Sequence, residues 1–279
     1  IAQDCYHFYE KFKLEHNNDS AAYYLAQRVN LDPTNVAWLN DAGQFADDYM
    51  ADYPLALDYF NRALALAIEQ QGEDSERVVE LYNHLGVICR KQGKYDEAMS
   101  HYSKALAICE KSLGGNHIET ALTHNNIGRL MDDRGQAPQA LEHYLKSLEI
   151  IEKELGTEHL NTATSYNVLG TFYYSRGDLA KSMDYLNKSL AIREKLLDSD
   201  HPDLATTYSN IGSVYTAMGD NTHALEYFTR ALDIRKQVLG ETHPDVALTL
   251  SDMGMAFLAL SDYDKALEFY FKALEIKEK

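Results

Sequence analysis

Four histidines that recur at a fixed interval are the first residues of this chain that could do chemistry. They are 42 residues apart, at His117, His159, His201 and His243. Histidine is the commonest metal ligand in proteins, so a regular row of histidines could hold a ladder of metal ions. Stacked repeats, however, lie about 10 Å apart, whereas zinc binds its ligands at about 2 Å. One ion therefore cannot bridge two neighbours, and we interpret the histidines as structural caps of helices.

The cysteines and two further histidines are the other candidates for reactivity. Cys5, Cys89 and Cys109 have no Cys-x-x-Cys spacing, so the sequence predicts neither a disulfide framework nor a zinc cluster. Cys89 falls on a recurring core position and is expected to be buried and inert, whereas we expect Cys109 to be partly exposed and open to reaction. His124 and His143 could meet acidic side chains in space, but we expect them to lie solvated on exposed helix surfaces.

The usual catalytic motifs are missing from the sequence. There is no Walker lysine loop, no G-x-G-x-x-G, no H-E-x-x-H and no G-x-S-x-G. We therefore predict that these residues carry no enzyme activity and hold no cofactor and no metal ion.

The composition of the chain limits the classes of partner it can bind and the cell compartment in which we expect it. The 26 basic and 43 acidic residues give a net charge of −17, which argues against nucleic acid, because phosphate binding requires clustered Lys and Arg. No apolar run approaches the roughly 18 residues of a membrane span, and the chain does not open on a signal peptide. We expect a cytoplasmic protein that binds neither nucleic acid nor a membrane, with an acidic first quarter, residues 1–76, as a possible docking surface for a basic partner.

Glycines repeat with the same 42-residue period and predict the elements that position these side chains. The first set is Gly86, Gly128, Gly170, Gly212 and Gly254. Seven residues after each stands a residue suited to a turn, namely Gly93, Gly135, Gly177, Gly219 and Ser261. Apolar residues before and after these turns recur at spacings of three and four, so each unit is predicted to be helix, turn, helix. A glycine on the core face lets the second helix approach closely.

Capping signals and register divide the whole chain into such units. Asn116, Asp200 and Thr242, each followed three residues later by an acid, are predicted to begin helices. The front of the chain is less regular, and its first two helices are expected at residues 3–16 and 19–30. We predict one array of seven helix pairs, a short first unit and a truncated last one, with boundaries at residues 1–34, 35–76, 77–118, 119–160, 161–202, 203–244 and 245–279. The chain begins with Ile and ends inside a helix, so we expect a fragment whose last edge is covered by more chain or by a partner.

The pattern resembles the tetratricopeptide repeat, W-x-x-L-G-x-x-Y followed by A-x-x-x-F. It stands here as Tyr82-x-x-Leu85-Gly86-x-x-Cys89 with Ala98 and Tyr102. The 42-residue unit, with its Leu-Gly-x-x-His-Pro-Asp linker, is similar to the repeats of kinesin light chains. The resemblance implies an all-α, right-handed α-solenoid of about seven antiparallel helix-turn-helix repeats, a superhelix that holds a peptide along the concave face of its first helices.

The face opposite the core supplies candidate groove residues, which are mostly amides and hydroxyls. An Asn amide can pair with any peptide backbone, although Asn can also simply solvate a helix surface. We expect an acidic partner residue near Arg90, Lys91 and Arg129 and an apolar one near Met255 and Leu258, the alternative for Arg90 and Lys91 being solvated charges. The predicted groove residues are Asn83, His84, Arg90, Lys91, Asn125, Asn126, Arg129, Asn167, Thr171, Tyr174, Ser209, Asn210, Ser213, Asp252 and Met255.

Three functional hypotheses follow from the sequence. The first is a non-catalytic scaffold or adaptor that binds a peptide segment of a partner, or of its own chain, in the groove. The second is the sensor or regulatory arm of a larger enzyme, a nucleotide-dependent switch or a protease, whose catalytic domain lies outside these residues. The third is self-association through uncapped ends of the array.

Overall fold

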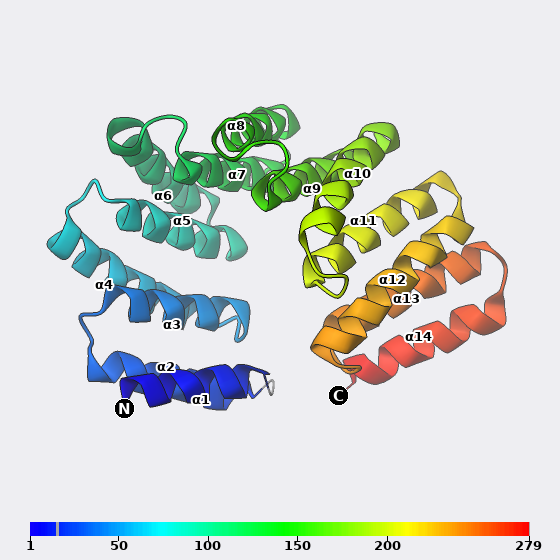
Figure 1. Cartoon of the computed structure of the whole chain (residues 1–279), viewed down its shortest axis with the longest axis horizontal. Helices are drawn as coiled ribbons and strands as arrows, with labels where there is room; N and C mark the ends of the chain where they lie inside the picture. The colour runs from blue at the N-terminus through cyan, green and yellow to red at the C-terminus, as the bar shows by residue number, and fades with distance from the viewer. Residues whose placement is uncertain (15–16, 279) are drawn as a thin grey trace. The chain divides into compact units, whose positions relative to one another are not determined.

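The structure is a computed structural model that describes residues 1–14 and 17–278. The described residues form fourteen α-helices, which follow one another as packed antiparallel pairs (Figure 1). A five-residue π-helix, η1 (Cys109–Leu113), extends the sixth α-helix. The predicted all-α repeat fold is confirmed; the last two residues of the helix predicted at 3–16 lie outside the described residues. The helices are α1 (Ala2–Leu14), α2 (Asn18–Leu31), α3 (Val36–Asp48), α4 (Tyr53–Gln71), α5 (Glu76–Lys91), α6 (Tyr95–Ile108), α7 (Ile118–Asp133), α8 (Ala137–Leu155), α9 (Leu160–Tyr174), α10 (Leu179–Leu196), α11 (Pro202–Met218), α12 (Asn221–Leu239), α13 (Pro244–Ala259) and α14 (Tyr263–Lys277).

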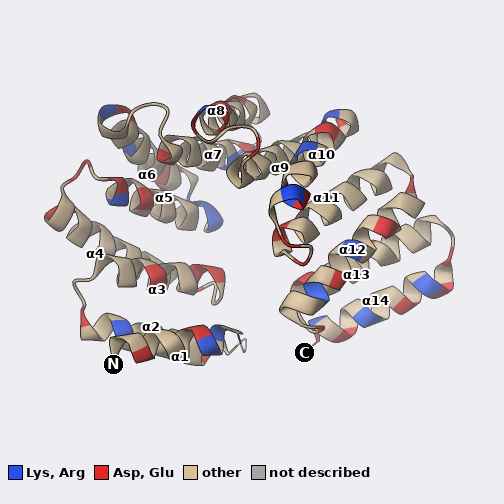
Figure 2. Cartoon of the chain, in the orientation of Figure 1, with Lys and Arg blue, Asp and Glu red and all other residues tan. Residues whose placement is uncertain are grey.

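The chain divides into two compact units. Unit 1 is Ile1–Glu154 and contains α1 to α7 and nearly all of α8, and unit 2 is Leu155–Lys279 and contains α9 to α14. In the charge-coloured view, α3 of unit 1 carries acidic residues and no basic ones (Figure 2). No helix in the described part of the chain is long and apolar enough to cross a membrane.

The two helices of a pair pack through the periodic glycines. A Cβ atom added to Gly128 would lie 2.7 Å from the ring of Tyr144, and one added to Gly212 would lie 2.7 Å from the ring of Phe228. Both distances are far shorter than van der Waals contact, so only glycine admits the aromatic ring of the second helix at these positions. The predicted close approach of paired helices is confirmed.

The predicted turns are confirmed as well. Gly93, Gly135, Gly177 and Gly219 all have positive φ angles, and Ser261, which replaces the fifth glycine, has a φ of 62°. An L-residue rarely adopts this left-handed conformation. The repeat geometry therefore imposes the turn even where the sequence has lost the glycine.

The periodic histidines cap the first helices, which confirms the interpretation that excluded a metal ladder. The Nδ1 atom of His201 accepts a hydrogen bond from the backbone N–H of Asp203 at 3.1 Å, and His243 does the same for Asp245 at 3.1 Å. The ring nitrogen thus satisfies one of the unpaired N–H groups at the start of a helix, as an Asn or Ser side chain would. The predicted caps Asn116, Asp200 and Thr242 were wrong by one residue, because the histidine that follows each of them performs this role.

The prediction for Cys109 was also wrong. Its side chain is fully buried, because the first helix of the next repeat covers it through Thr120 and Thr123. Cys89 is buried as predicted. Burial raises the pKa of both thiols, and this disfavours the reactive thiolate.

Candidate peptide-binding site

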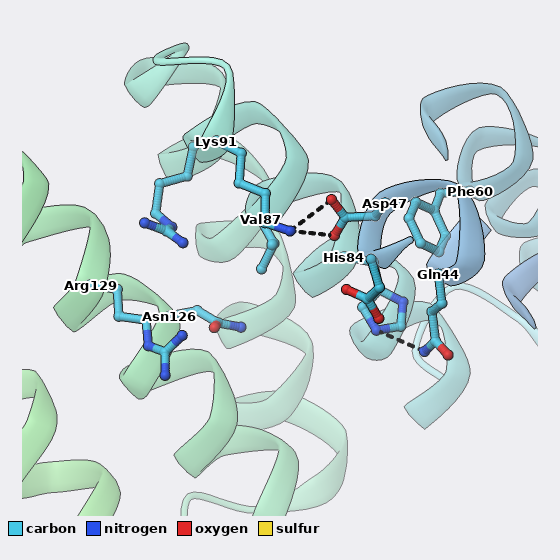
Figure 3. A pocket seen from close by; sticks show the side chains of 10 residues that line it. Gln44, Asp47, Phe60, His84, Val87, Lys91, Asn126 and Arg129 are labelled. Atoms are coloured by element: carbon cyan, nitrogen blue, oxygen red, sulfur yellow. Dashed lines mark hydrogen bonds and ion pairs between the residues drawn. The ribbon is translucent and has the colours of Figure 1, made fainter. Parts of the chain in front are cut away.

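A hollow of about 400 Å³ opens on the first helices of unit 1 (Figure 3). We call it the groove hollow. It brings together five of the predicted groove residues, His84, Arg90, Lys91, Asn126 and Arg129. The sequence did not indicate its other lining residues, which are Gln44, Asp47, Asp48, Phe60 and Val87.

His84 lines the groove hollow and joins α5 to α3 through hydrogen bonds. Its Nδ1 atom lies 3.0 Å from Oδ1 of Asn40, and the amide nitrogen of Gln44 lies 3.3 Å from its Nε2 atom. Nδ1–H therefore donates to Asn40 and Nε2 accepts from Gln44, a tautomer that uses both ring nitrogens. Burial lowers the pKa of His84 to about 4, so the ring is neutral at pH 7. His84 therefore supports α3 against α5 and offers a ligand no charge.

Arg90 and Lys91 are already neutralised by carboxylates of neighbouring repeats. Arg90 Nη1 lies 2.6 Å from Oδ2 of Asp133. Lys91 Nζ lies 2.7 and 2.8 Å from the two carboxylate oxygens of Asp47 (Figure 3). An acidic ligand would have to displace one of these carboxylates, so neither cation is well placed to attract it.

Arg129 and Asn126, which lie on α7, are the polar donors that remain available in the groove hollow. Arg129 is exposed and forms no ion pair or hydrogen bond with another described residue. The half-buried Asn126 likewise has no hydrogen-bond partner among the described side chains. A guanidinium and an amide within one turn of each other can bind a carboxylate and a peptide carbonyl together.

Asn83, another predicted residue of unit 1, joins two first helices to one another. Asn83 is only 6% exposed, and its Nδ2 atom donates to Thr123 Oγ1 at 3.0 Å. Asn125, at the same repeat position on α7, is half-buried. At Asn83 the recurrent asparagine therefore stabilises the contact between α5 and α7, the first helices of two successive repeats.

In unit 2 four of the eight predicted residues form hydrogen bonds within their own chain. Asn210 donates to Oδ1 of Asn167 at 3.0 Å, and Ser209 is buried. The hydroxyls of Thr171 and Ser213 donate to backbone carbonyls of their own helices.

Three other predicted residues of unit 2 differ in their exposure to solvent. Tyr174 on α9 is exposed, and so are Met255 and the nearby Leu258 on α13. Asp252 is half-buried, and burial raises its pKa to about 6. Unit 2 therefore offers an apolar surface at Met255 and Leu258 but no unpaired cation among its predicted groove residues.

Four of the five lining residues that the sequence did not indicate, Gln44, Asp47, Asp48 and Phe60, come from the irregular front of the chain. The first-helix pattern returns there with about two extra residues, and its side chains contact the next repeat: His84 meets Gln44 across 40 residues, and Lys91 meets Asp47 across 44. Of these residues, only Phe60 could have been found from the sequence, because it lies 42 residues before the buried Tyr102 and so keeps the repeat register. No group of three His, Cys, Asp or Glu side chains within the described residues is arranged to hold a metal ion.

Helix pairs that pack through small residues and repeat along the described chain define a helical-repeat solenoid. The chain belongs to the tetratricopeptide repeat family. The family model matches residues 36–107, 77–146, 133–195, 169–237 and 203–279.

Solved structures share this fold. BtubC (BKLC) from P. vanneervenii is 24% identical, with 82% of this chain and 92% of that chain covered and a TM-score of 0.62. A protein described as a kinesin light chain with nearly identical TPR-like repeats, from Podosopora anserina, is 23% identical, with 71% and 94% covered and a TM-score of 0.60. Aspartyl phosphate phosphatase F from Bacillus subtilis is 15% identical, with 94% and 64% covered and a TM-score of 0.63. A search of curated proteins found no match.

Proposed function

We propose that this protein is an interaction scaffold that binds a peptide segment of a partner protein in the groove hollow, with an acidic side chain of the peptide on Arg129. The tetratricopeptide repeats and the kinesin light chain-like fold support a protein-interaction scaffold. The family is generally non-catalytic. The peptide, its acidic residue and its place on unit 1 are the proposed part.

The observation that carries the proposal is the difference between Arg129 and its neighbours. Arg90 and Lys91 hold carboxylates of this chain, whereas the guanidinium of Arg129 has no such partner in the described structure. A guanidinium binds a carboxylate through two parallel hydrogen bonds, which gives orientation as well as affinity. Asn126 adds a donor and an acceptor for the peptide backbone beside that carboxylate.

The other hypotheses have less support. Nothing in the described residues favours the regulatory arm of an enzyme, and the likeness to the phosphatase, at 15% identity, shows the fold alone. Self-association predicts a mass that rises with concentration in sedimentation experiments, whereas a monomeric scaffold stays at 31.6 kDa.

The test is selection of random displayed peptides on the whole chain, followed by fluorescence anisotropy with the selected peptides. We expect enrichment of Asp and Glu, and Arg129→Ala should weaken binding by roughly ten- to a hundred-fold, since a charge-assisted hydrogen bond contributes about 1.5–3 kcal/mol. Arg62→Ala is the matched control, because Arg62 is an exposed cation of unit 1 that lies outside the groove hollow. Selected peptides without acids, or equal affinity for Arg129→Ala, would contradict the proposal.

A further inference from the structure

In unit 2, arginines of the chain close the junctions between successive repeats. Arg193 on α10 is 4% exposed, and its Nη1 atom donates to the backbone carbonyl of Asp203 at 3.0 Å and to Thr207 Oγ1 at 2.6 Å. Its Nη2 atom lies 3.3 Å from Thr164 Oγ1 and 3.6 Å from Oδ2 of Asp203. The guanidinium is thus surrounded by a carbonyl, two hydroxyls and a carboxylate.

The next junction repeats this arrangement. Arg235, 42 residues after Arg193, donates to the carbonyl of Asp245 at 3.4 Å and to Thr249 Oγ1 at 2.5 Å. The first turn of a first helix is therefore a binding place for a guanidinium, and in unit 2 the preceding second helix supplies it.

Unit 1 contains the same acceptors without the arginine. Two repeats before Thr164, Asp203 and Thr207, at an offset of twice 42 residues, the sequence has Glu80, Glu119 and Thr123. The position of Arg193 is taken by the fully buried Cys109, whose thiol contacts Thr120 and Thr123 but carries no charge and cannot donate in several directions as a guanidinium does. The acceptors of this junction thus have more negative charge than in unit 2, and the preceding second helix supplies no guanidinium to them.

A hollow of about 350 Å³ opens at this junction, and we call it the acidic hollow. Arg77 Nη1 lies 2.5 Å from Oε2 of Glu80 and neutralises that carboxylate. Glu76 and Glu119 form no ion pair with another described residue, so the charges around the hollow sum to about −2 at high pH. Its lining residues are Gln71, Glu76, Arg77, Glu80 and Glu119.

A buried acceptor lies behind Glu119. The amide of Asn83 hydrogen-bonds the carboxyl of Glu119, a lining residue of the acidic hollow, as well as Thr123. Its Oδ1 atom is buried and has no hydrogen-bond partner. A buried acceptor without a donor is unfavourable, and a ligand with several N–H groups would relieve it.

We propose that the acidic hollow binds an arginine side chain of a partner protein, in the place where Arg193 and Arg235 bind in unit 2. The chain's own junctions favour arginine over lysine, because a planar guanidinium donates in several directions to a carbonyl, a hydroxyl and a carboxylate at once. The carboxylates do not converge as a metal site would require, which favours an extended cationic group over a metal ion. This site does not depend on Arg129, so it adds a basic residue to the partner chemistry of the groove hollow.

Proton release accompanies binding at this site. Burial, together with the charges of Glu80 and Glu76, raises the pKa of Glu119 to about 7. A bound guanidinium favours the ionised carboxylate and lowers that pKa by about 1 unit or more. Arginine binding should therefore strengthen several-fold between pH 6 and pH 8.

The experiment titrates the whole chain, with carboxyl-¹³C-labelled Glu, against N-acetyl-arginine amide. N-acetyl-citrulline amide is the control probe, because citrulline has the shape of arginine without its charge. We expect a saturable shift of the Glu119 carboxyl resonance, and a lower pKa for Glu119, with the arginine compound only. Equal shifts with both compounds, or none with either, would overturn the proposal.

Two variants separate this site from the proposed groove. Glu119→Gln should abolish the response of the unit 1 backbone amides to the arginine compound, whereas Glu149→Gln, an exposed acid on α8, should leave it unchanged. Arg129→Ala should bind the arginine compound as the parent does, even if it no longer binds acidic peptides. If Glu119→Gln binds the arginine compound as well as the parent, the acidic hollow is not its site.

Discussion

The junctions between repeats differ in the two units, although the helices on either side are built alike. In unit 2 the chain's own arginines, the buried Arg193 and its counterpart Arg235, form hydrogen bonds across the junctions between repeats. Unit 1 connects its repeats with ion pairs such as Arg90–Asp133, and Glu119 forms no ion pair with another described residue. The same position of a repeat can thus stabilise the array or remain open to a partner, and the choice depends on one residue of the preceding helix.

The contacts inside the repeats differ as well. Unit 2 pairs Tyr166 with Tyr185 across a repeat, at a ring-centroid distance of 6.0 Å. The corresponding residues of unit 1 are His124 and His143, whose Nδ1 atoms lie 3.0 Å apart. The expectation that these histidines are simply solvated was wrong, because each is the hydrogen-bond partner of the other. Unit 1 therefore has a titratable contact where unit 2 has an aromatic one.

The largest expected effect is the loss of the arginine that closes a junction. Arg193→Ala leaves the carboxylate of Asp203 and two hydroxyls without their donor and should destabilise the junction by about 3 kcal/mol. Hydrogen exchange of the first-turn amides of α11 measures this loss. Lys195→Ala, which removes an exposed ion pair with Glu158, should change exchange by about 0.5 kcal/mol or less. Equal effects of the two variants would show that the buried arginine does not hold the junction.

The periodic glycines test what the two units share. Gly128→Ala in unit 1 and Gly212→Ala in unit 2 each push a methyl group into an aromatic ring, and each should lower the free energy of unfolding by about 1–3 kcal/mol. Urea unfolding followed by circular dichroism measures both. A large effect in one unit and none in the other would mean that helix packing, as well as the polar junctions, differs between them.

The histidine pair should make unit 1 sensitive to acid. One ring donates through Nδ1–H and the other accepts, so the pair cannot keep this hydrogen bond with both rings protonated. Burial, and after it the charge of His143, lowers the pKa of His124 to about 4. Burial, and after it the charge of Lys146, lowers the pKa of His143. The carboxylate of Glu142 opposes both shifts. The unfolded chain therefore binds more protons, and stability falls as the pH drops from about 6.5 towards 4.

Replacing both rings tests this sensitivity. The double variant His124→Tyr, His143→Tyr restores the aromatic pair of unit 2 and should recover about 1–2 kcal/mol at pH 4.5, with little change at pH 8. Hydrogen exchange of α7 and α8 at the two pH values measures the effect. A gain of the same size at both pH values would attribute it to packing alone.

The smallest expected effect comes from Glu119 in the absence of a ligand. Its pKa is raised from 4.5 to about 7, so the folded state binds more protons and unit 1 loses stability as the pH rises through that window. Glu119→Gln should remove this slope and gain about 1 kcal/mol at pH 8, after allowance for partial exposure. Thermal unfolding at pH 5 and pH 8 gives the comparison, and an unchanged slope would show that Glu119 is not the titrating group.

The sequence predicted the fold well because packing follows the repeat period. A glycine at one position meets a large side chain 16 residues later, as Gly128 meets Tyr144, in each of the last five units, so periodicity alone places them. The same period also contained Arg193 and Arg235, 42 residues apart, which could have indicated the closed junctions.

The candidate site was only partly predictable. Asn126 and Arg129 could be placed on the groove because they lie on one face of a regular helix. The ion-pair partners of Arg90 and Lys91 could not be predicted. They lie 43 and 44 residues away rather than 42, and the pairing depends on the path that each long side chain takes between repeats. Whether a cation is open to a ligand is decided by such pairings, and the repeat pattern does not contain them.

Ligand binding by unit 1 is the central claim, and hydrogen exchange of the whole chain with and without a selected acidic peptide tests it most directly. We predict slower exchange in α3, α5 and α7, which line the groove hollow, and loss of that protection in Arg129→Ala. Protection confined to α11 and α13, or protection of α5 and α7 that persists in Arg129→Ala, would contradict the account.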